Sequence, residues 1–260
     1  MKTATELFDG IVQIDGVATH VMRKGTGQPL LWLHGANGNR EWSPFLEALS
    51  KRFDVIAPEH PGFGDSKKEK WMKDFEDLVY HYCSLLDYFS IERAYVVGQS
   101  LGGQIASEFA VSQTHRVKKL VLTASSGLWV EGIERLDTFL LDQEQLAEKT
   151  FYNKKLAQAA AEKARLPEEQ ESFIRNRAAH ARFCWERQHN PKFNRTLKRI
   201  YVPTMIVWGE RDEIISPRYA HVFAEYIPDS KVVFLPECGH VPYIEKRDEY
   251  VSLLSDFLKD

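Results

Sequence analysis

The chain has 260 residues, 43% of them hydrophobic and 27% charged, which is typical of a folded globular protein and excludes a mainly disordered chain. Its 34 Lys and Arg and 37 Asp and Glu give a formal net charge of −3, which argues against nucleic acid as a partner. No apolar run reaches the roughly 20 residues of a membrane-spanning helix. The N-terminus has no apolar segment of a secretion signal, so we expect a cytoplasmic protein that does not bind membranes.

The three cysteines, Cys83, Cys184 and Cys238, lie far apart in the chain. No Cys-x-x-Cys pair is present, and no Cys and His residues have the spacing of a zinc site. An odd number of scattered cysteines is typical of a reducing compartment. We therefore expect three free thiols and no metal.

The first half of the chain alternates between predicted strands and helices. A hairpin is expected around Asp15-Gly16, with strands at 11–14 and 17–23, and the apolar run 30–33 is typical of a strand buried on both faces. Apolar spacing then predicts strands at 53–57, 94–97 and 117–123 and helices at 42–49, 75–89 and 101–111. This order is typical of a mostly parallel, doubly wound α/β sheet.

From residue 131 to 199 the pattern is helical, with no convincing strand and with expected breaks at Pro167 and Pro191. The predicted apolar helix faces are Leu136, Phe139 and Leu140, and Ile174, Ala178, Ala181 and Trp185. Strands at 204–208 and 231–235 and a helix at 247–258 follow. We therefore expect one α/β core domain, residues 1–130 and 200–260, with a helical cap inserted at 131–199.

Gly98-Gln99-Ser100-Leu101-Gly102 lies between a predicted strand and a predicted helix. It matches the Gly-x-Ser-x-Gly pattern, in which a serine sits on a sharp strand-to-helix turn. The two glycines carry no Cβ that would collide with the neighbouring strand and helix. The helix N-terminus adds unpaired N–H groups beside the serine oxygen. Ser100 is therefore a candidate nucleophile.

A serine nucleophile needs a base and an acid that orients the base. Strand 204–208 leads into Asp212, and strand 231–235 leads to His240. Because the carboxyl ends of parallel strands meet at one edge of the sheet, we expect both side chains near Ser100. Asp212 is the candidate acid, with Glu210 and Glu213 as alternatives, and His240 is the candidate base.

The chain resembles the α/β-hydrolase fold superfamily with a helical cap over essentially its whole length. The matching residues are His34-Gly35, Pro61-Gly62-Phe63-Gly64-Asp65-Ser66, the serine motif, Gly209-Glu210-Arg211-Asp212 with Pro217 downstream, and Gly239-His240. The resemblance implies a catalytic triad of Ser100, Asp212 and His240. It also implies an oxyanion hole formed by the N–H groups of Leu101 and Ala36.

Further residues are candidates for the substrate pocket or for its support. The side-chain amide of Asn37 is a second possible oxyanion donor. An apolar pocket is expected to draw on the aromatic residues Trp129, Phe139, Phe183 and Trp185. His34 and His60 precede tight turns, so we expect them to hold loop backbone rather than to catalyse.

Residues 172–199 contain 8 basic and 1 acidic residue, unlike the preceding part of the predicted cap. A solvated helix face explains this charge run. The alternative is that one or two of its arginines face the pocket and favour an anionic substrate: Arg175, Arg177, Arg182 or Arg187.

The sequence favours a carboxylic-ester hydrolase that acts on small or medium substrates through an acyl-enzyme, without a cofactor. A C–C bond hydrolase, a lactonase and a thioesterase with the same triad are alternatives. C–C hydrolases of aromatic-ring breakdown usually carry a Gly- and Pro-rich stretch where this chain has Ala36-Asn37-Gly38-Asn39. A ligand receptor and a non-catalytic scaffold on the same fold are further alternatives, and the oligomeric state stays open.

Overall fold

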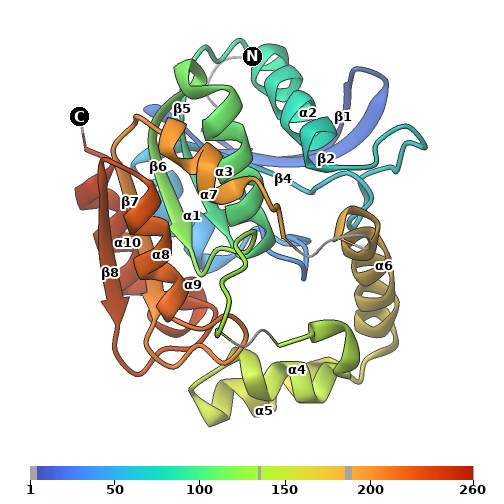
Figure 1. Cartoon of the computed structure of the whole chain (residues 1–260). Helices are drawn as coiled ribbons and strands as arrows, with labels where there is room; N and C mark the ends of the chain where they lie inside the picture. Colours follow the sequence, from blue (N-terminus) through green and yellow to red (C-terminus); the bar gives the residue numbers. More distant parts are fainter. Residues whose placement is uncertain (1–4, 134–135, 185–188, 260) are drawn as a thin grey trace.

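The computed structural model describes residues 5–133, 136–184 and 189–259. Eight strands form one sheet in the order β1-β2-β4-β3-β5-β6-β7-β8 (Figure 1). β1 (Phe8–Ile14) and β2 (Val17–Lys24) pair antiparallel, and β2 joins β4 antiparallel. The other strands run parallel: β3 (Gln28–Leu33), β4 (Phe53–Pro58), β5 (Ala94–Gln99), β6 (Val117–Thr123), β7 (Thr204–Gly209) and β8 (Ser230–Leu235). The predicted α/β sheet is confirmed.

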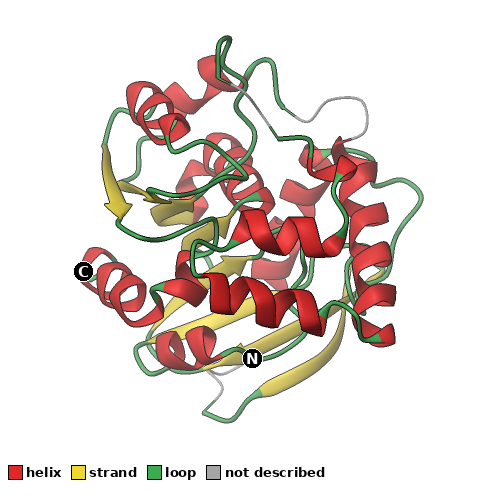
Figure 2. Ribbon diagram, turned by 90° about the horizontal axis from the view of Figure 1, so that it is seen from below, coloured by secondary structure: helices red, strands yellow, loops and turns green. Residues whose placement is uncertain are grey.

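Helices cover both faces of the sheet, as Figure 2 shows. α1 (Pro44–Ser50) and α10 (Arg247–Phe257) contribute to one buried cluster. α2 (Phe75–Tyr88), α3 (Leu101–Ser112) and α8 (Arg218–Tyr226) contribute to the cluster on the other face. Every residue of the central strand β5 is buried, which explains its continuous apolar sequence.

The hairpin that begins the sheet has the predicted turn. Asp15 and Gly16 both adopt positive φ, 48° and 80°, as a two-residue turn that matches the twist of the strands requires. The helix α8 was not predicted. It begins immediately after Pro217, which favours a helix start, and its apolar residues Tyr219, Ala220 and Phe223 face the core.

Three helices stand apart from the sheet between β6 and β7 (Figure 1). They are α4 (Gln143–Thr150), α5 (Lys154–Lys163) and α6 (Pro167–Cys184), and they are called the cap below. Asp142 and Asn153 cap α4 and α5 with side-chain oxygens, and Pro167 starts α6 at the predicted break. The short α7 (Phe193–Thr196) and α9 (Pro242–Glu245) lie elsewhere: Phe193 of α7 packs on Phe223 of α8, with ring centroids 6.3 Å apart.

The predicted apolar faces of the cap are wrong at Leu140, Ile174 and Ala178, which are exposed, whereas Leu136 and Phe139 are half-buried and Trp185 lies outside the described residues. Leu140 is 80% exposed in the short turn Thr138–Leu140, and Ile174 of α6 is 67% exposed. Instead α6 buries Asn176, Ala179, Phe183 and Cys184. The buried side of α6 therefore combines apolar residues with Asn176, whose amide is hydrogen-bonded to loops of the core, and it does not follow the apolar spacing of the sequence.

Among the described residues, no helix combines the length and the apolar character needed to cross a bilayer.

Candidate active site

Ser100 occupies a strained turn between β5 and α3. Its φ is 53°, a value that residues other than glycine rarely adopt, and its N–H donates to Thr123 O at 2.9 Å. A Cβ on Gly98 would overlap the backbone of Gly102, and one on Gly102 would overlap the backbone of Leu33. The two glycines therefore allow α3 to begin directly above the sheet with Ser100 at the turn.

His240 and Asp212 form a buried pair at the ends of β8 and β7. His240 Nδ1 lies 2.8 Å from Asp212 Oδ2, and the two side chains are 8% and 0% exposed. The other carboxylate oxygen of Asp212 accepts the N–H groups of Ile214 and Ile215 at 2.8 and 3.0 Å. These bonds fix the carboxylate, and a neutral His240 that donates from Nδ1 has Nε2 free to accept a proton.

Neither alternative to Asp212 is paired with His240 in the described part of the chain. Glu213 is exposed and forms an ion pair with Lys149 of α4. Glu210 is also exposed. Of the three carboxylates, the structure brings only Asp212 into contact with His240.

The candidate oxyanion loop, residues 35–38, lies beside the serine. Its turn is closed by the Gly38 N–H donating to Gly35 O at 3.1 Å, with Ala36 and Asn37 at the centre. A Cβ added to Gly35 would be 3.4 Å from Ser100 Cβ. Leu101 is the first residue of α3, so no carbonyl of the helix can accept its N–H.

His34 and His60 hold this loop, as expected. His34 Nδ1 lies 2.6 Å from Gly35 O, and His34 Nε2 accepts the His60 N–H at 2.9 Å. His60 Nε2 lies 2.8 Å from His34 O. Burial lowers the pKa of His34 to about 4 and that of His60 well below its usual range, so both rings are neutral donors and acceptors at neutral pH.

A cavity of about 100 Å³, called the inner pocket, contacts both Ser100 and His240. Several predicted residues line it, namely Ala36, Asn37, Leu101 and Phe139. Trp129 is absent from its lining; it is half exposed, and its ring stacks on His189 at a centroid distance of 5.9 Å. Trp185 lies outside the described residues, and Phe183 is buried against Phe75.

A second cavity of about 230 Å³, called the cap pocket, lies between the three cap helices and the loop 35–38. It shares seven lining residues with the inner pocket: Ala36, Asn37, Thr138, Phe139, Leu146, Thr150 and His180. Its remaining wall combines the apolar residues Ala147, Phe151, Ala160, Ala164 and Phe173 with polar and charged residues, among them Lys163, Glu169 and Arg177. The two cavities therefore form adjoining parts of one site.

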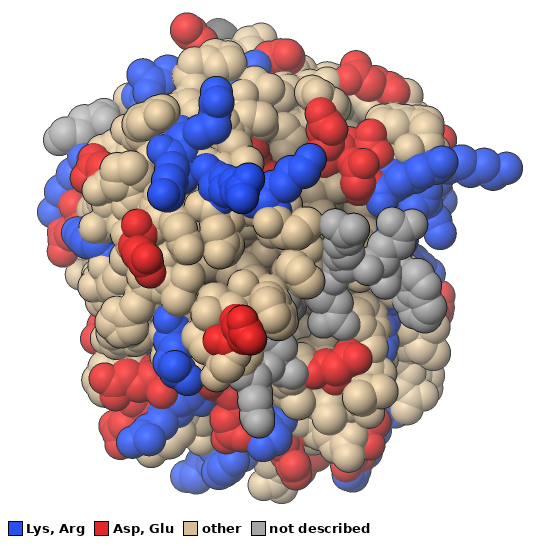
Figure 3. Space-filling model, viewed as in Figure 1, with Lys and Arg blue, Asp and Glu red and all other residues tan. Residues whose placement is uncertain are grey.

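The arginines of α6 do not present free charges to the inner pocket. Arg177 lines the cap pocket, but its guanidinium donates to Leu141 O and Thr138 O at 3.0 and 3.1 Å. Arg175 pairs with Glu171, and Arg182 donates to Glu69 O and Lys70 O. Arg187 lies outside the described residues. Figure 3 shows acidic and basic side chains mixed over the same face as in Figure 1.

Some residues of the site carry no recognisable signal in the sequence. Thr150 and Tyr243 line the inner pocket, and His180 stacks against Phe139 at 5.1 Å between ring centroids. No motif or apolar spacing in the sequence points to His180. Its neighbours in the site come from the loop 35–38 and from α4, which only the packing of the cap brings close.

The described cysteines are free thiols, and burial raises the pKa of Cys238 to about 12, so this thiol is not a nucleophile at neutral pH. Within the described ranges, no group of three or more His, Cys, Asp or Glu side chains is arranged to hold a metal ion.

A family model described as alpha/beta hydrolase fold matches residues 28–247. Among similar sequences, 2-hydroxymuconate semialdehyde hydrolase of Pseudomonas sp. (strain CF600) is 28% identical over 265 residues, covering 94% of this chain and 92% of the relative. Lipase 1 of Psychrobacter immobilis is 28% identical over 240 residues, covering 86% of this chain and 74% of the relative.

Solved structures give the same fold. A meta-cleavage product hydrolase from Pseudomonas fluorescens IP01 superposes with a TM-score of 0.77 at 25% identity, covering 95% of this chain and 96% of that one. The naproxen esterase of Bacillus subtilis has a TM-score of 0.79 at 18% identity, covering 98% and 92% of the two chains, a likeness of fold alone.

Proposed function

The chain belongs to the α/β-hydrolase fold family, and on this basis we propose that it is a serine hydrolase of neutral carboxylic esters. One observation carries the proposal. Ser100, on its strained turn, and His240, hydrogen-bonded to the buried Asp212, both line the inner pocket. Nucleophilic catalysis by serine needs a nucleophile, a base and an acid that orients the base, and these three residues can supply them.

The reaction follows from these groups. Ser100 Oγ attacks the ester carbonyl carbon while His240 Nε2 takes its proton. The carbonyl electron pair moves onto oxygen, where the N–H groups of Leu101 and Ala36 stabilise it. The alcohol leaves with the proton from His240, and a water that His240 activates then releases the acid from the serine.

The sizes of the two cavities suggest which part of a substrate each cavity holds. The inner pocket, about 100 Å³, suits a short acyl or alkoxy group beside Ser100. The cap pocket is about 230 Å³, and an apolar cavity of about 150 Å³ already holds a benzene ring. We propose that the larger, apolar end of the ester lies in the cap pocket.

Charge supports a neutral ester. Among the described residues of the inner pocket there is no Lys or Arg. In the cap pocket the guanidinium of Arg177 is engaged by two carbonyls, and Lys163 forms an ion pair with Glu169 at 3.3 Å. A carboxylate in the inner pocket would therefore lose its hydration without a cation from these residues. Neutral esters should react faster than anionic esters of the same size at low salt.

A C–C bond hydrolase is the second candidate, because similar sequences include 2-hydroxymuconate semialdehyde hydrolase and a 2-hydroxy-6-oxo-2,4-heptadienoate hydrolase of Pseudomonas putida. The same serine would attack the ketone carbonyl of such a substrate. The sequence Ala36-Asn37-Gly38-Asn39 and the lack of a described cation in the inner pocket argue against this alternative.

The test compares kcat/KM of the purified protein for p-nitrophenyl butyrate and for 2-hydroxy-6-oxo-2,4-heptadienoate, each with Ser100→Ala as the control. The proposal predicts Ser100-dependent turnover at least tenfold higher for the ester. A preference of the same size for the dienoate would reject ester hydrolysis in favour of C–C hydrolysis, and Ser100-independent turnover of both would reject the serine mechanism.

A further inference from the structure

Asn176 is a polar side chain buried in the middle of a cap helix. It lies on α6 and is 2% exposed, while the apolar Ile174 two residues earlier is 67% exposed. Burial of an amide is unfavourable unless its donor and acceptor are both satisfied. The position of Asn176 therefore depends on what its amide contacts.

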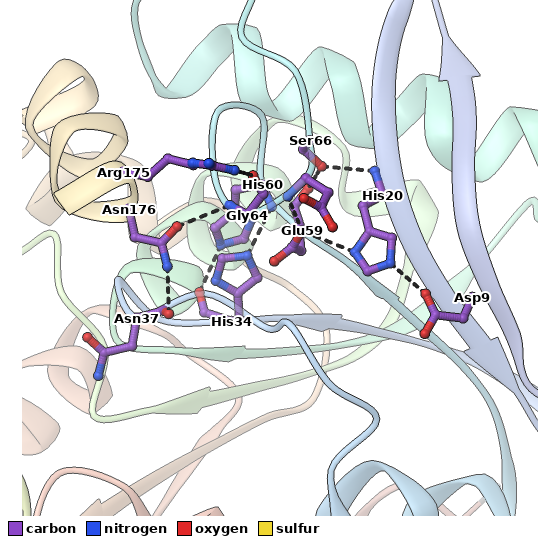
Figure 4. A network of polar contacts seen from close by, with 11 residues as sticks. Asp9, His20, His34, Asn37, Glu59, His60, Gly64, Ser66, Arg175 and Asn176 are labelled. Atoms are coloured by element: carbon purple, nitrogen blue, oxygen red, sulfur yellow. Dashed lines mark hydrogen bonds and ion pairs between the residues drawn. The ribbon is translucent and has the colours of Figure 1, made fainter. Parts of the chain in front are cut away.

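The donor and the acceptor of the Asn176 side chain each form a hydrogen bond with a loop of the core. Asn176 Nδ2 donates to Asn37 O at 2.8 Å, and Asn176 Oδ1 accepts the Gly64 N–H at 3.1 Å. Figure 4 shows the amide lying between these two loops, which are separate in the sequence. Asn37 belongs to the candidate oxyanion loop and is the residue directly after Ala36.

The oxyanion loop is shaped to receive this side chain. Gly38 has φ +87°, and a Cβ there would lie 2.6 Å from Asn176 Nδ2. The only backbone bond that closes the loop's turn is the one from the Gly38 N–H to Gly35 O, and Asn37 itself is exposed. The hydrogen bond from Asn176 thus holds the outer side of the loop, while His34 holds its inner side at Gly35 O.

The opposite contact is also fixed. Gly64 follows the turn at His60 and Pro61, and the neighbouring Glu59 accepts the Asp65 N–H at 2.7 Å and lies 3.0 Å from His20 Nδ1. This network, drawn in Figure 4, anchors the Gly64 loop to the sheet. Asn176 therefore connects the oxyanion loop to a rigid part of the core through the cap.

We propose that Asn176 is a positioning residue: it holds the loop 35–38 so that the Ala36 N–H points at the developing oxyanion, and it couples the seating of the cap to the formation of the oxyanion hole. This inference rests on the proposed serine mechanism. Removal of one oxyanion donor costs about 10²–10³ in kcat in a serine protease. Misalignment of a donor that remains present should cost less, about 10- to 100-fold.

The test uses Asn176→Leu, which keeps the approximate shape but removes both hydrogen bonds, and Asn176→Ala. The expected result is a fall in kcat of about 10- to 100-fold on p-nitrophenyl butyrate, with KM within about threefold of the wild type. The affinity for an aliphatic trifluoromethyl ketone should fall in step with kcat/KM. Its adduct with Ser100 Oγ places a negative oxygen in the oxyanion hole, so a merely structural role of Asn176 would not produce this correlation.

Arg175→Ala is the matched control. Arg175 is the preceding residue of α6, and its guanidinium donates to Gly64 O at 3.0 Å without contacting the oxyanion loop. It should leave kcat within about twofold. Gly38→Ala disturbs the same contact from the loop side and should reproduce the loss, and its effect should not add to that of Asn176→Leu. If the Asn176 variants fail to fold, the Gly38 variant alone tests the role of this contact.

The outcomes separate the two proposals. If the wild type shows Ser100-dependent turnover and folded Asn176 or Gly38 variants keep kcat and ketone affinity within about twofold, the role of Asn176 is rejected and the serine mechanism stands. If the wild type itself shows no Ser100-dependent turnover, the proposed function is rejected, and this inference is rejected with it.

Discussion

The backbone N–H of His240 donates to the carbonyl of Thr150, the last residue of α4, at 2.8 Å. The loop that carries the candidate base is thus bonded directly to the cap. Glu245 adds a second link, because its carboxylate oxygens accept the Gly239 N–H at 2.5 Å and the Asn153 N–H at 2.8 Å. Displacing the cap from this loop should disturb His240 without touching its side chain.

Gly239→Ala tests this link. A Cβ at Gly239 would lie 2.5 Å from Thr150 O and 2.8 Å from Tyr152 N, so the cap must shift. We expect kcat/KM for p-nitrophenyl butyrate to fall about tenfold or more, in keeping with the sensitivity of catalysis to misplacements of about 1 Å. Gly10→Ala is the control, since its Cβ would meet only ordinary contacts, with Phe8 at 3.5 Å. Equal activity of the two variants would contradict the link.

Asp212→Asn should lower kcat by about 10³- to 10⁴-fold, because an amide cannot both accept from His240 Nδ1–H and accept the N–H groups of Ile214 and Ile215 without a mismatched group. Glu213→Gln changes a neighbouring exposed carboxylate and should keep kcat within about twofold. Steady-state kinetics on one ester checks both. If Asp212→Asn keeps more than a tenth of the activity, another acid orients His240.

Ala160→Phe should restrict the protein to esters with shorter chains. Ala160 lines the cap pocket, so a phenyl group there fills space that we assign to the large end of the ester. The expected result is a loss of about tenfold or more in kcat/KM for p-nitrophenyl decanoate, with p-nitrophenyl acetate unchanged within about twofold. The same change at Ala159, an exposed neighbour on α5, is the control. Parallel losses on both esters would argue against this use of the cap pocket.

Stability should fall as the pH rises from neutral. The hydrogen bond to Glu59 raises the pKa of His20 from 6.5 to about 9, and Asp9 adds to the effect. Because the raised pKa belongs to the folded state, its stabilisation is complete below pH 6.5 and is lost as the pH passes 9. Urea unfolding should show that the free energy of unfolding falls by about 2 kcal/mol across this range. This is less than the whole pKa shift would give, because the pair is partly solvated.

His20→Gln provides the comparison for that series. The variant is less stable at pH 7 because the buried Glu59 carboxylate loses its charged partner and keeps only the Asp65 N–H, but its stability should be flat across the same interval. A wild type as flat as the variant would mean that His20 does not carry a proton between the two carboxylates.

The core could be predicted from the sequence because each strand carries its own signal. Strand β5, the Asp15-Gly16 turn and the glycines around Ser100 are local patterns, and each is found where it was expected. Asp212 and His240 followed from their positions after strands, since the carboxyl ends of parallel strands meet. The match to the α/β-hydrolase family extends over residues 28–247.

The cap could not be predicted in the same way. The longest of its helices, α6, has a weak amphipathic pattern, and its buried side combines Ala179, Phe183 and Cys184 with the polar Asn176, which is hydrogen-bonded to two distant loops. Periodicity therefore assigned Ile174 to the buried face, although it is exposed. Trp129 was assigned to the pocket on its aromatic character alone, but its position depends on the path of the loop that follows β6.

The central claim is that Ser100 is the nucleophile of an ester hydrolase. Its most direct test is the rate of wild type and Ser100→Ala on p-nitrophenyl esters from acetate to decanoate at neutral pH, with the folding of both proteins verified by circular dichroism. If Ser100 is the nucleophile, the wild type turns these esters over and the variant is slower by about a thousandfold or more. Folded Ser100→Ala that retains the wild-type rates would contradict it.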